Sequence, residues 1–210
     1  MKILLFVEGQ TEREALPRFF HRWLDEHAQP GIGIKAIRFQ GASEYLRDIR
    51  SRVELYLEKT SKSEVLGAIG LLDFYGCPAL PPSSEPLPQR YQRAKAALEN
   101  KVGHNRFRQH FAVHETEAWL FSEPSILPRP VREALPKSTE QPEQVDFDEP
   151  PAKLLLRLYD KKLNRRYRKP VDGQNLFQKL SPNVASNKCY HLKLLLEDLL
   201  SLARRREGEA

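Results

Sequence analysis

The stretch Ile-Leu-Leu-Phe-Val-Glu-Gly-Gln-Thr-Glu, residues 3–12, decides the fold of this chain. Its first five residues form an unbroken apolar run, which is typical of a strand buried on both faces. Glu8 and Gly9 end that run, and a helical pattern that starts with a second acid, Glu12, follows at once. Open α/β sheets bind ligands at the carboxyl ends of their strands, and carboxylate oxygens suit a hard divalent cation such as Mg²⁺. The stretch therefore predicts metal-assisted chemistry on an α/β fold.

The strand-then-helix pattern recurs further along the chain. Apolar runs predict strands at 31–39, 65–72 and 107–113. Helical spacing predicts helices that begin near residues 11, 43 and 89, and a short one at 118–121. Thr11 and Glu14 have the spacing of a capping box, and Pro17 predicts a kink or a later start for the first helix. The order βαβαβαβ predicts a mostly parallel sheet with helical crossovers.

The chain divides by composition into three expected parts. Residues 1–122 form the expected α/β core. Residues 123–151 are rich in proline and acids and hold no periodic apolar run, so we expect a loop or lid there. From residue 152 onward, leucines at helical spacing predict a basic helical extension, 152–210, that packs on the core.

The overall composition fits one α/β domain with a helical appendage, since the 210 residues are 40% hydrophobic. The net charge of +6 is compatible with a polyanionic partner. No run approaches the ~20 apolar residues that span a membrane, and no signal peptide is expected. We therefore expect a cytoplasmic protein with Cys77 and Cys189 reduced. The chain has no Walker A or Gly-x-Gly-x-x-Gly motif for a nucleotide.

Acids follow three of the four expected strands. Glu8 and Glu12 follow the first, Asp73 follows the third, and Glu115 and Glu117 follow the fourth. Parallel strands bring these carboxylates to one edge of the sheet, where they repel one another unless cations are bound. Two metal ions about 4 Å apart are the usual apparatus for in-line displacement at phosphorus. All five acids are expected metal ligands, and Glu8 and Asp73 are also expected to be catalytic.

A less specific explanation exists for most of these acids. Taken singly, each acid other than Glu8 is better explained as a helix cap or a solvated loop residue. Glu8 differs because Gly9 beside it indicates an unusual turn. The coincidence of acids at three strand ends favours a functional site.

A dense basic segment follows at 161–169, interleaved with tyrosines. Basic groups pair with phosphates, and tyrosines stack on bases, although a solvated surface explains the run equally well. The expected nucleic-acid-binding residues are Lys161, Lys162, Arg165, Arg166, Arg168 and Lys169. Lys188, which precedes the last helix, is the expected catalytic lysine that stabilises charge on phosphorus. Lys169 is the alternative candidate for that role.

Several of these segments resemble a known family. Val-Glu-Gly-Gln-Thr-Glu (7–12), Leu-Asp-Phe-Tyr-Gly (72–76) and His-Glu-Thr-Glu-Ala-Trp-Leu (114–120) resemble motifs of the family catalogued as domain of unknown function 4276. Residues 167–173 and 188–191 resemble its C-terminal part. That family is similar to Toprim domains, especially those of the overcoming-lysogenization-defect (OLD) nucleases. Toprim domains usually carry Asp-x-Asp where this chain has Asp73-Phe74-Tyr75, so we expect one or two ions.

The resemblance implies a four-stranded parallel Toprim sheet between helices and Mg²⁺- or Mn²⁺-dependent cleavage of nucleic acid. It also implies bacterial defence against phage beside an SMC-like or ABC-like ATPase partner. We therefore expect a nuclease subunit that acts on DNA or RNA, away from membranes, with its oligomeric state open. The alternative is a catalytically inactive Toprim-like module that binds a partner ATPase or nucleic acid. Topoisomerase-like or primase-like chemistry ranks last, because 210 residues leave no room for a separate nucleophile or priming domain.

Overall fold

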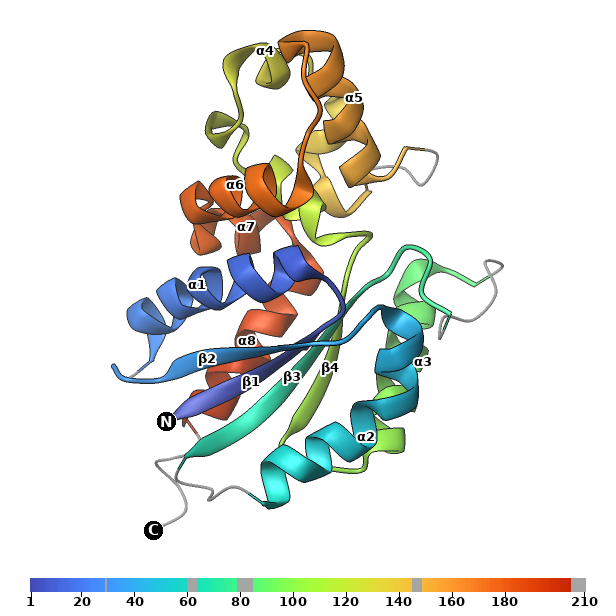
Figure 1. Cartoon of the computed structure of the whole chain (residues 1–210), viewed down its shortest axis with the longest axis vertical. Coiled ribbons are helices and arrows are strands. Elements are labelled where there is room, and N and C mark those ends of the chain that lie inside the picture. The colour runs from blue at the N-terminus through green and yellow to red at the C-terminus, as the bar shows by residue number, and fades with distance from the viewer. Residues whose placement is uncertain (29, 60–63, 79–84, 145–148, 205–210) are drawn as a thin grey trace.

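Four parallel strands form one sheet in the computed structural model, which describes residues 1–28, 30–59, 64–78, 85–144 and 149–204. The spatial order is β2-β1-β3-β4 (Figure 1). The strands are β1 (Lys2–Val7), β2 (Gly33–Arg38), β3 (Val65–Asp73) and β4 (Phe107–Ala112). The structure confirms the expected four-stranded parallel sheet flanked by helices, with a C-terminal helical extension.

The sheet lies between two helical layers. Helices α1 (Gln10–His27) and α8 (Tyr190–Arg204) cover one face, and α2 (Ala42–Glu58) and α3 (Leu87–Val102) cover the other (Figure 1). Successive side chains of β1 point to opposite faces, so the strand contributes to two cores. Ile3, Leu5 and Val7 pack with α1 and α8, whereas Leu4 and Phe6 pack with α2 and α3. The apolar run at the start of the chain is unbroken because both faces of β1 are buried.

Helix α1 differs from its predicted form at its start. It begins at Gln10 after Gly9, which makes no side-chain cap, and Thr11 is already buried within its first turn. The predicted capping box of Thr11 and Glu14 is therefore wrong. Pro17 lies inside a helix that continues to His27, because Leu16 and Phe19 on either side of it are fully buried in the core. Tertiary packing outweighs the local cost of the proline.

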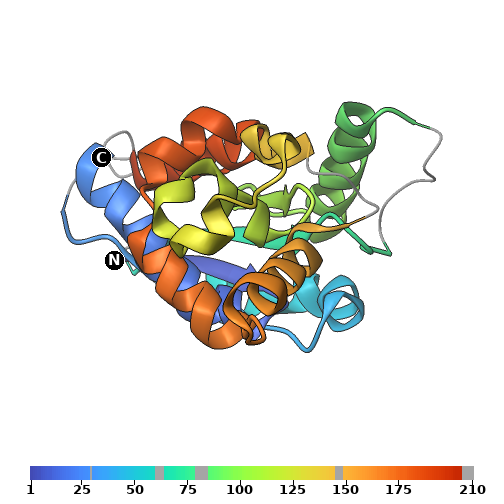
Figure 2. The ribbon, with the colours of Figure 1, turned by 90° about the horizontal axis from the view of Figure 1, so that it is seen from above.

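A helical region lies over the carboxyl end of the sheet (Figures 1 and 2). It is built from short elements, which include a π-helical turn, η5. They are η1 (Thr116–Ser122), η2 (Pro124–Ile126), α4 (Arg129–Arg132), η3 (Lys137–Glu140), η4 (Pro142–Gln144), α5 (Pro151–Leu163), η5 (Lys169–Gly173), α6 (Gln174–Lys179) and α7 (Pro182–Lys188).

The segment expected to be a loop or lid thus consists, where it is described, mainly of short helical turns. Leu127 and Val131 within it are buried in the same core as Trp119. Helix α5 starts beside the sheet and runs away from it, so its C-terminal end lies at the far end of the molecule (Figure 1). None of the described helices has the length and apolar character needed to cross a membrane.

Candidate active site

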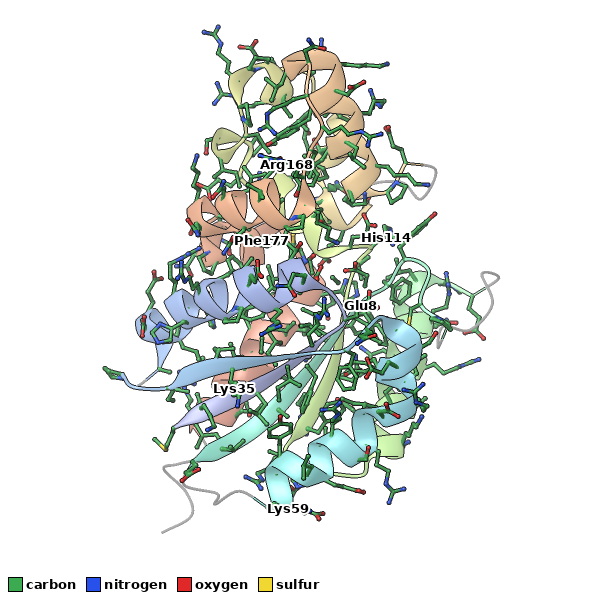
Figure 3. The ribbon with its side chains drawn as sticks, in the orientation of Figure 1. Glu8, Lys35, Lys59, His114, Arg168 and Phe177 are labelled. Atoms are coloured by element: carbon green, nitrogen blue, oxygen red, sulfur yellow. The ribbon has the colours of Figure 1, made fainter. Side chains whose placement is uncertain are left out.

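The site lies where the direction of the strand connections reverses. From β1 the chain crosses to β2 on one side, and it then returns to place β3 on the other side of β1. A crevice at the carboxyl ends of two such strands is the usual ligand site of an open α/β sheet. Glu8 directly follows β1, and Asp73 is the last residue of β3. Figure 3 shows Glu8 and His114 at this edge, below the helical region.

The close approach of the Glu12 side chain explains why a glycine follows Glu8. Gly9 has extended backbone angles, φ −106° and ψ 160°, so the predicted unusual turn is wrong. A Cβ atom at this position would lie only 1.8 Å from Oε2 of Glu12. The missing side chain of Gly9 therefore makes room for the Glu12 carboxylate, which is held in the crevice by the first turn of α1.

Three carboxylates converge on one ammonium group. Nζ of Lys169, at the start of η5, lies 3.1 Å from Oε1 of Glu117, 3.3 Å from Oε1 of Glu12 and 3.9 Å from Oδ2 of Asp73. The Glu117 side chain is fully buried and that of Glu12 is 5% exposed, whereas Lys169 keeps 35% of its side-chain surface exposed. We call Glu12, Asp73, Glu117 and Lys169 the acidic cluster. Residues from four separate segments of the chain thus meet at one point.

Thr116 contacts all three carboxylates of the acidic cluster, and no sequence motif indicated this role. Its backbone N–H donates to Oδ1 of Asp73 at 3.0 Å. Its hydroxyl lies 3.2 Å from Oε1 of Glu12 and 3.5 Å from Oε2 of Glu117. Thr116 is buried, so these hydrogen bonds are shielded from water. The one available signal was its position between two acids in His-Glu-Thr-Glu.

The electrostatics of the cluster are those of crowded buried acids. Burial raises the pKa of Asp73 well above its usual range, and Glu12, Glu117 and Glu8 raise it further against the pull of Lys169. Burial likewise raises the pKa of Glu117 to about 7. Burial alone lowers the pKa of Lys169, but the three carboxylates outweigh that effect and raise it. The cluster therefore has more carboxyl groups than one ammonium neutralises, and without a further cation its buried acids tend to hold protons.

Glu8 lies at the border of the cluster and is half-buried. Burial and the Glu12 carboxylate raise its pKa, while a backbone hydrogen bond from Asp73 and the charge of Lys169 lower it. A raised pKa makes a carboxylate a stronger base, which suits it to accept a proton.

Glu115 points to a different partner. Its Oε2 accepts a 2.8 Å hydrogen bond from the backbone N–H of Ala152, in the first turn of α5. The structure thus brings Glu8, Glu12, Asp73 and Glu117 together. Glu115 lies beside them, but its carboxylate is hydrogen-bonded to the start of α5. Across the described residues, no three His, Cys, Asp or Glu side chains stand in a ready metal-binding arrangement. The ammonium of Lys169 occupies the centre that the carboxylates share.

The predicted basic residues have three different environments. Arg165 makes a double ion pair with Asp172, with both N–O distances at 2.9 Å. Lys161, Lys162, Arg166 and Arg168 are exposed and form no ion pair with a described residue. Lys169 lies in the acidic cluster. Arg168 is in the helical region above α6 (Figure 3).

Lys188, the expected catalytic lysine, lies elsewhere. It is exposed at the end of α7, next to the buried Cys189. It forms no ion pair with the acidic cluster within the described part of the chain. The structure therefore brings Lys169 to the carboxylates and leaves Lys188 on the surface.

The Gly9→Ala variant tests the role of the glycine. We expect its Cβ to push the Glu12 carboxylate away from Lys169, because that carboxylate is the movable end of a flexible side chain. The backbone angles of Gly9 suit alanine, so the melting temperature of the variant should change by only about 2 °C. We expect affinity for Mn²⁺ to fall about tenfold in calorimetric titrations, since misplaced ligands bind metal poorly. Gly33→Ala is the control, because a Cβ there meets only an ordinary contact at 3.8 Å. Equal affinity in both variants would contradict this role for Gly9.

Comparisons with known proteins agree with this architecture. The C-terminal region of the OLD protein of Xanthomonas campestris pv. campestris shares 17% identity with this chain, with a TM-score of 0.50 over 98% of each chain. The C-terminal region of the Burkholderia pseudomallei OLD protein also shares 17% identity, with a TM-score of 0.49 over 96% of this chain and 98% of that one. No curated protein shows significant sequence similarity to the chain.

The first of these likenesses shows a shared fold, and at 17% identity it shows the fold alone. A sequence-family model gives the classification independently. It matches residues 7–200, which include every residue of the acidic cluster. The chain therefore belongs to the family described as domain of unknown function (DUF4276).

Proposed function

We propose that this chain is a divalent-metal-dependent nuclease subunit of the Toprim type, which hydrolyses phosphodiester bonds in DNA or RNA. The observation that carries the proposal is the convergence of Glu12, Asp73 and Glu117 on Lys169 at the switch point of the sheet. Acids and a lysine in one crevice supply the two needs of phosphoryl transfer, which are ligands for a cation and a positive charge for the phosphate. The fold shared with an OLD C-terminal region supports this class of chemistry.

The donor set fits Mg²⁺ or Mn²⁺ in its chemistry. All the candidate ligands are carboxylate oxygens, which hard divalent cations prefer. Oε2 of Glu12 and Oε1 of Glu117 are buried and have no aligned hydrogen-bond partner among the described residues. Glu12, Asp73 and Glu117 would hold the ion, with Glu8 at the border. When bound there, the ion would lower the pKa of a coordinated water and would offset negative charge on the phosphate.

The protein residues then have distinct tasks. Glu8 would accept the proton of the attacking water as the new oxygen–phosphorus bond forms. The bond from phosphorus to the ester oxygen then breaks, and that oxygen takes a proton from solvent. Lys169, with its partly exposed side chain, gives up its contacts in the cluster and donates to the phosphate, where negative charge accumulates. Glu115 keeps the start of α5 in place beside the site.

A basic path on α5 supports a nucleic-acid substrate. Ala152 contacts Glu115, and Lys161 follows nine positions later in the same helix. At about 1.5 Å per residue this places Lys161 roughly 14 Å further from the site. Along the axis of a duplex each strand carries one phosphate per about 3.4 Å, so 14 Å measured along that axis corresponds to roughly four phosphates. We propose Lys161, Lys162, Arg166 and Arg168 as the backbone contacts.

Two observations favour the alternative, a catalytically inactive module that binds nucleic acid or an ATPase. Lys169 already occupies the centre of the cluster, and Tyr75 stands where Toprim domains usually carry a second aspartate. In that case Lys169 is a permanent internal cation, and the cluster binds no metal. On the family resemblance alone, we further propose an SMC-like or ABC-like ATPase partner and a cytoplasmic role in defence against phage.

Cleavage assays with labelled plasmid, single-stranded DNA and RNA test the proposal. Mg²⁺, Mn²⁺ and EDTA are compared for the wild type, Glu8→Ala and Asp73→Ala. We expect metal-dependent cleavage that falls at least 100-fold in both variants, since each removes a group on which the chemistry depends. Lys188→Ala is the control and should cleave like the wild type. A folded wild type that neither binds Mn²⁺ in calorimetry nor cleaves any substrate would support the inactive module.

A further inference from the structure

The segment between α5 and α6 brings Lys169 to the site, and one carboxylate holds that segment together. Asp172 is the only acid between residues 161 and 179, a stretch that carries all of the predicted nucleic-acid-binding residues. Its side chain is only 10% exposed. The proposed chemistry gives this buried charge no task, so its contacts need an explanation.

The carboxylate of Asp172 joins two parts of the segment. It forms the double ion pair with the Arg165 guanidinium, and its Oδ2 accepts a 2.7 Å hydrogen bond from the backbone N–H of Arg168. The carbonyl of Arg168 in turn accepts from the backbone N–H groups of Val171 and Asp172, at 3.0 and 2.7 Å. We call the contacts of Asp172 with Arg165 and Arg168 the clamp. The clamp fixes the backbone of Arg168, to which Lys169 is directly bonded.

The guanidinium that completes the clamp is itself held in place. Arg165 follows the end of α5, where Asn164 has the left-handed angles φ 51° and ψ 37°. Its Cζ lies 4.8 Å from the centre of the ring of Tyr159, which is buried. Burial would raise the pKa of Asp172, but the hydrogen bonds from Arg165 and Arg168 outweigh that effect and lower the pKa. Asp172 is therefore charged at neutral pH, and the ion pair is a charge-assisted one.

The other end of the segment packs on the wall of the site. A Cβ at Gly173 would lie 3.2 Å from Cγ2 of Thr11, in the first turn of α1 and next to Glu12. From between these two anchors, Nζ of Lys169 reaches the three carboxylates of the acidic cluster. The segment is thus held by Arg165 at its start and by Thr11 at its end, with Lys169 between them.

We propose that Asp172, through the clamp, is a positioning residue for Lys169. Lysine is a point charge on a flexible stem, so the place of its ammonium depends on where its backbone is held. The clamp fixes the backbone from which the ammonium reaches the carboxylates and, during cleavage, the phosphate. Arg165 serves the site by completing the clamp. The inference rests on the proposed nuclease function, since the step that it assists belongs to that function.

Asp172→Asn removes the charge and keeps the shape of the side chain. We expect kcat for cleavage to fall about 10–100-fold with KM for nucleic acid unchanged, because a slightly misplaced catalytic group loses most of its effect. The melting temperature should fall by only about 2–4 °C, since the Arg165 side of the ion pair is exposed. A lower KM with an unchanged kcat would overturn the inference, because Asp172 would then only keep Arg165 from the phosphates.

The reactivity of Lys169 supplies a readout that needs neither metal nor substrate. Reductive methylation in the presence of EDTA, followed by peptide mass spectrometry, measures how fast each lysine reacts through its uncharged amine. The ammonium of Lys169 is paired with three carboxylates in the wild type, so it should react slowly. We expect Asp172→Asn to speed its methylation about tenfold, since an amine whose pKa is lower by one is uncharged about ten times as often.

Arg165→Lys is the second variant, because it keeps the positive charge but cannot form the double ion pair. It should lower kcat and speed the methylation of Lys169, as Asp172→Asn does. Glu149→Gln is the matched control, since it breaks another double arginine–carboxylate pair, with Arg157 of α5. That pair holds no residue of the acidic cluster, so kcat and the methylation of Lys169 should stay unchanged.

The two readouts separate the inference from the nuclease proposal. Wild-type methylation of Lys169 in Asp172→Asn would overturn the inference, and cleavage by the wild type would leave the nuclease intact. Faster methylation with an unchanged kcat would also overturn it, because the position of Lys169 would then not matter for cleavage. If the wild type cleaved no substrate, faster methylation in Asp172→Asn would support the clamp and contradict the nuclease.

Discussion

In Lys169→Met we expect the free energy of unfolding at pH 8 to fall by about 2–3 kcal/mol and cleavage to be lost. Removing one partner of a fully buried ion pair typically costs about 3–5 kcal/mol. Lys169 keeps 35% of its side-chain surface exposed, and solvent screening reduces that figure. The loss arises because Glu12, Asp73 and Glu117 then share a buried site with no cation. Urea unfolding in the presence of EDTA measures this fall in the free energy of unfolding.

The same variant should respond to pH and to metal in a defined way. Without Lys169 the carboxylates bind protons more tightly in the folded state than in the unfolded state, so its stability falls as pH rises. The difference from the wild type should therefore be small at pH 5 and largest at pH 8. Mg²⁺ should raise the melting temperature of Lys169→Met more than that of the wild type, because the ion no longer competes with an ammonium.

Lys188→Met is the control for this experiment, since it removes an exposed lysine outside the cluster. It should match the wild type in stability, in metal response and in cleavage. If Mg²⁺ stabilised neither Lys169→Met nor the wild type, the cluster would be a structural ion-pair network and the metal proposal would fail.

The sequence was informative about the site wherever a strand determines the position of a residue. β1 and β3 are buried on both faces, so their apolar runs mark their ends to within a residue. Glu8 and Asp73 follow from those ends, and the parallel order brings them to one edge. Glu12 follows as well, because it lies in the first turn of the helix that β1 leads into.

The parts that the sequence left undecided depend on irregular or distant segments. Glu115 and Glu117 are two residues apart, yet one contacts α5 and the other the cluster. The short 3₁₀ turn between them has no repeating pattern from which to assign faces. The choice between Lys169 and Lys188 depends on how the helical region folds back over the sheet, and the clamp of Arg165 on Asp172 is part of that folding. Local spacing cannot reveal such contacts.

Glu117→Gln should uncouple stability from activity. The pKa of Glu117 is raised from 4.5 to about 7 in the folded protein. A group with a raised folded pKa contributes stability that is fully present below its unfolded value, and this stability is lost as pH rises through the folded value. At pH 8 the ionised Glu117 should therefore lower the free energy of unfolding by up to about 3 kcal/mol, at 1.36 kcal/mol for each pKa unit. Glutamine carries no charge, so the variant should be more stable than the wild type at pH 8.

The groups that face Glu117 set the pH window for this test. Glu12, Glu115 and Lys169 act on its charge, Thr116 lies 3.5 Å from it, and Tyr167 stays protonated. The raised pKa of Lys169 places its own titration above this window. Between pH 5 and pH 8 in EDTA, the wild-type melting temperature should thus decline with a slope that Glu117→Gln reduces. Asp73, whose pKa is also raised, maintains part of the slope.

Activity should change in the opposite direction. A glutamine oxygen binds divalent cations less well than a carboxylate, so cleavage should fall at least 100-fold although the fold is more stable. Such a trade-off is the signature of a charge retained for function. Glu115→Gln is the matched control, since it weakens the hydrogen bond to Ala152 and removes a smaller contribution to the raised pKa of Glu117. It should lower the free energy of unfolding by about 0.5–2 kcal/mol and keep most of the wild-type pH slope. A Glu117→Gln variant that is less stable than the wild type at pH 8 would show that the carboxylate serves the fold, and the site assignment would lose its main support.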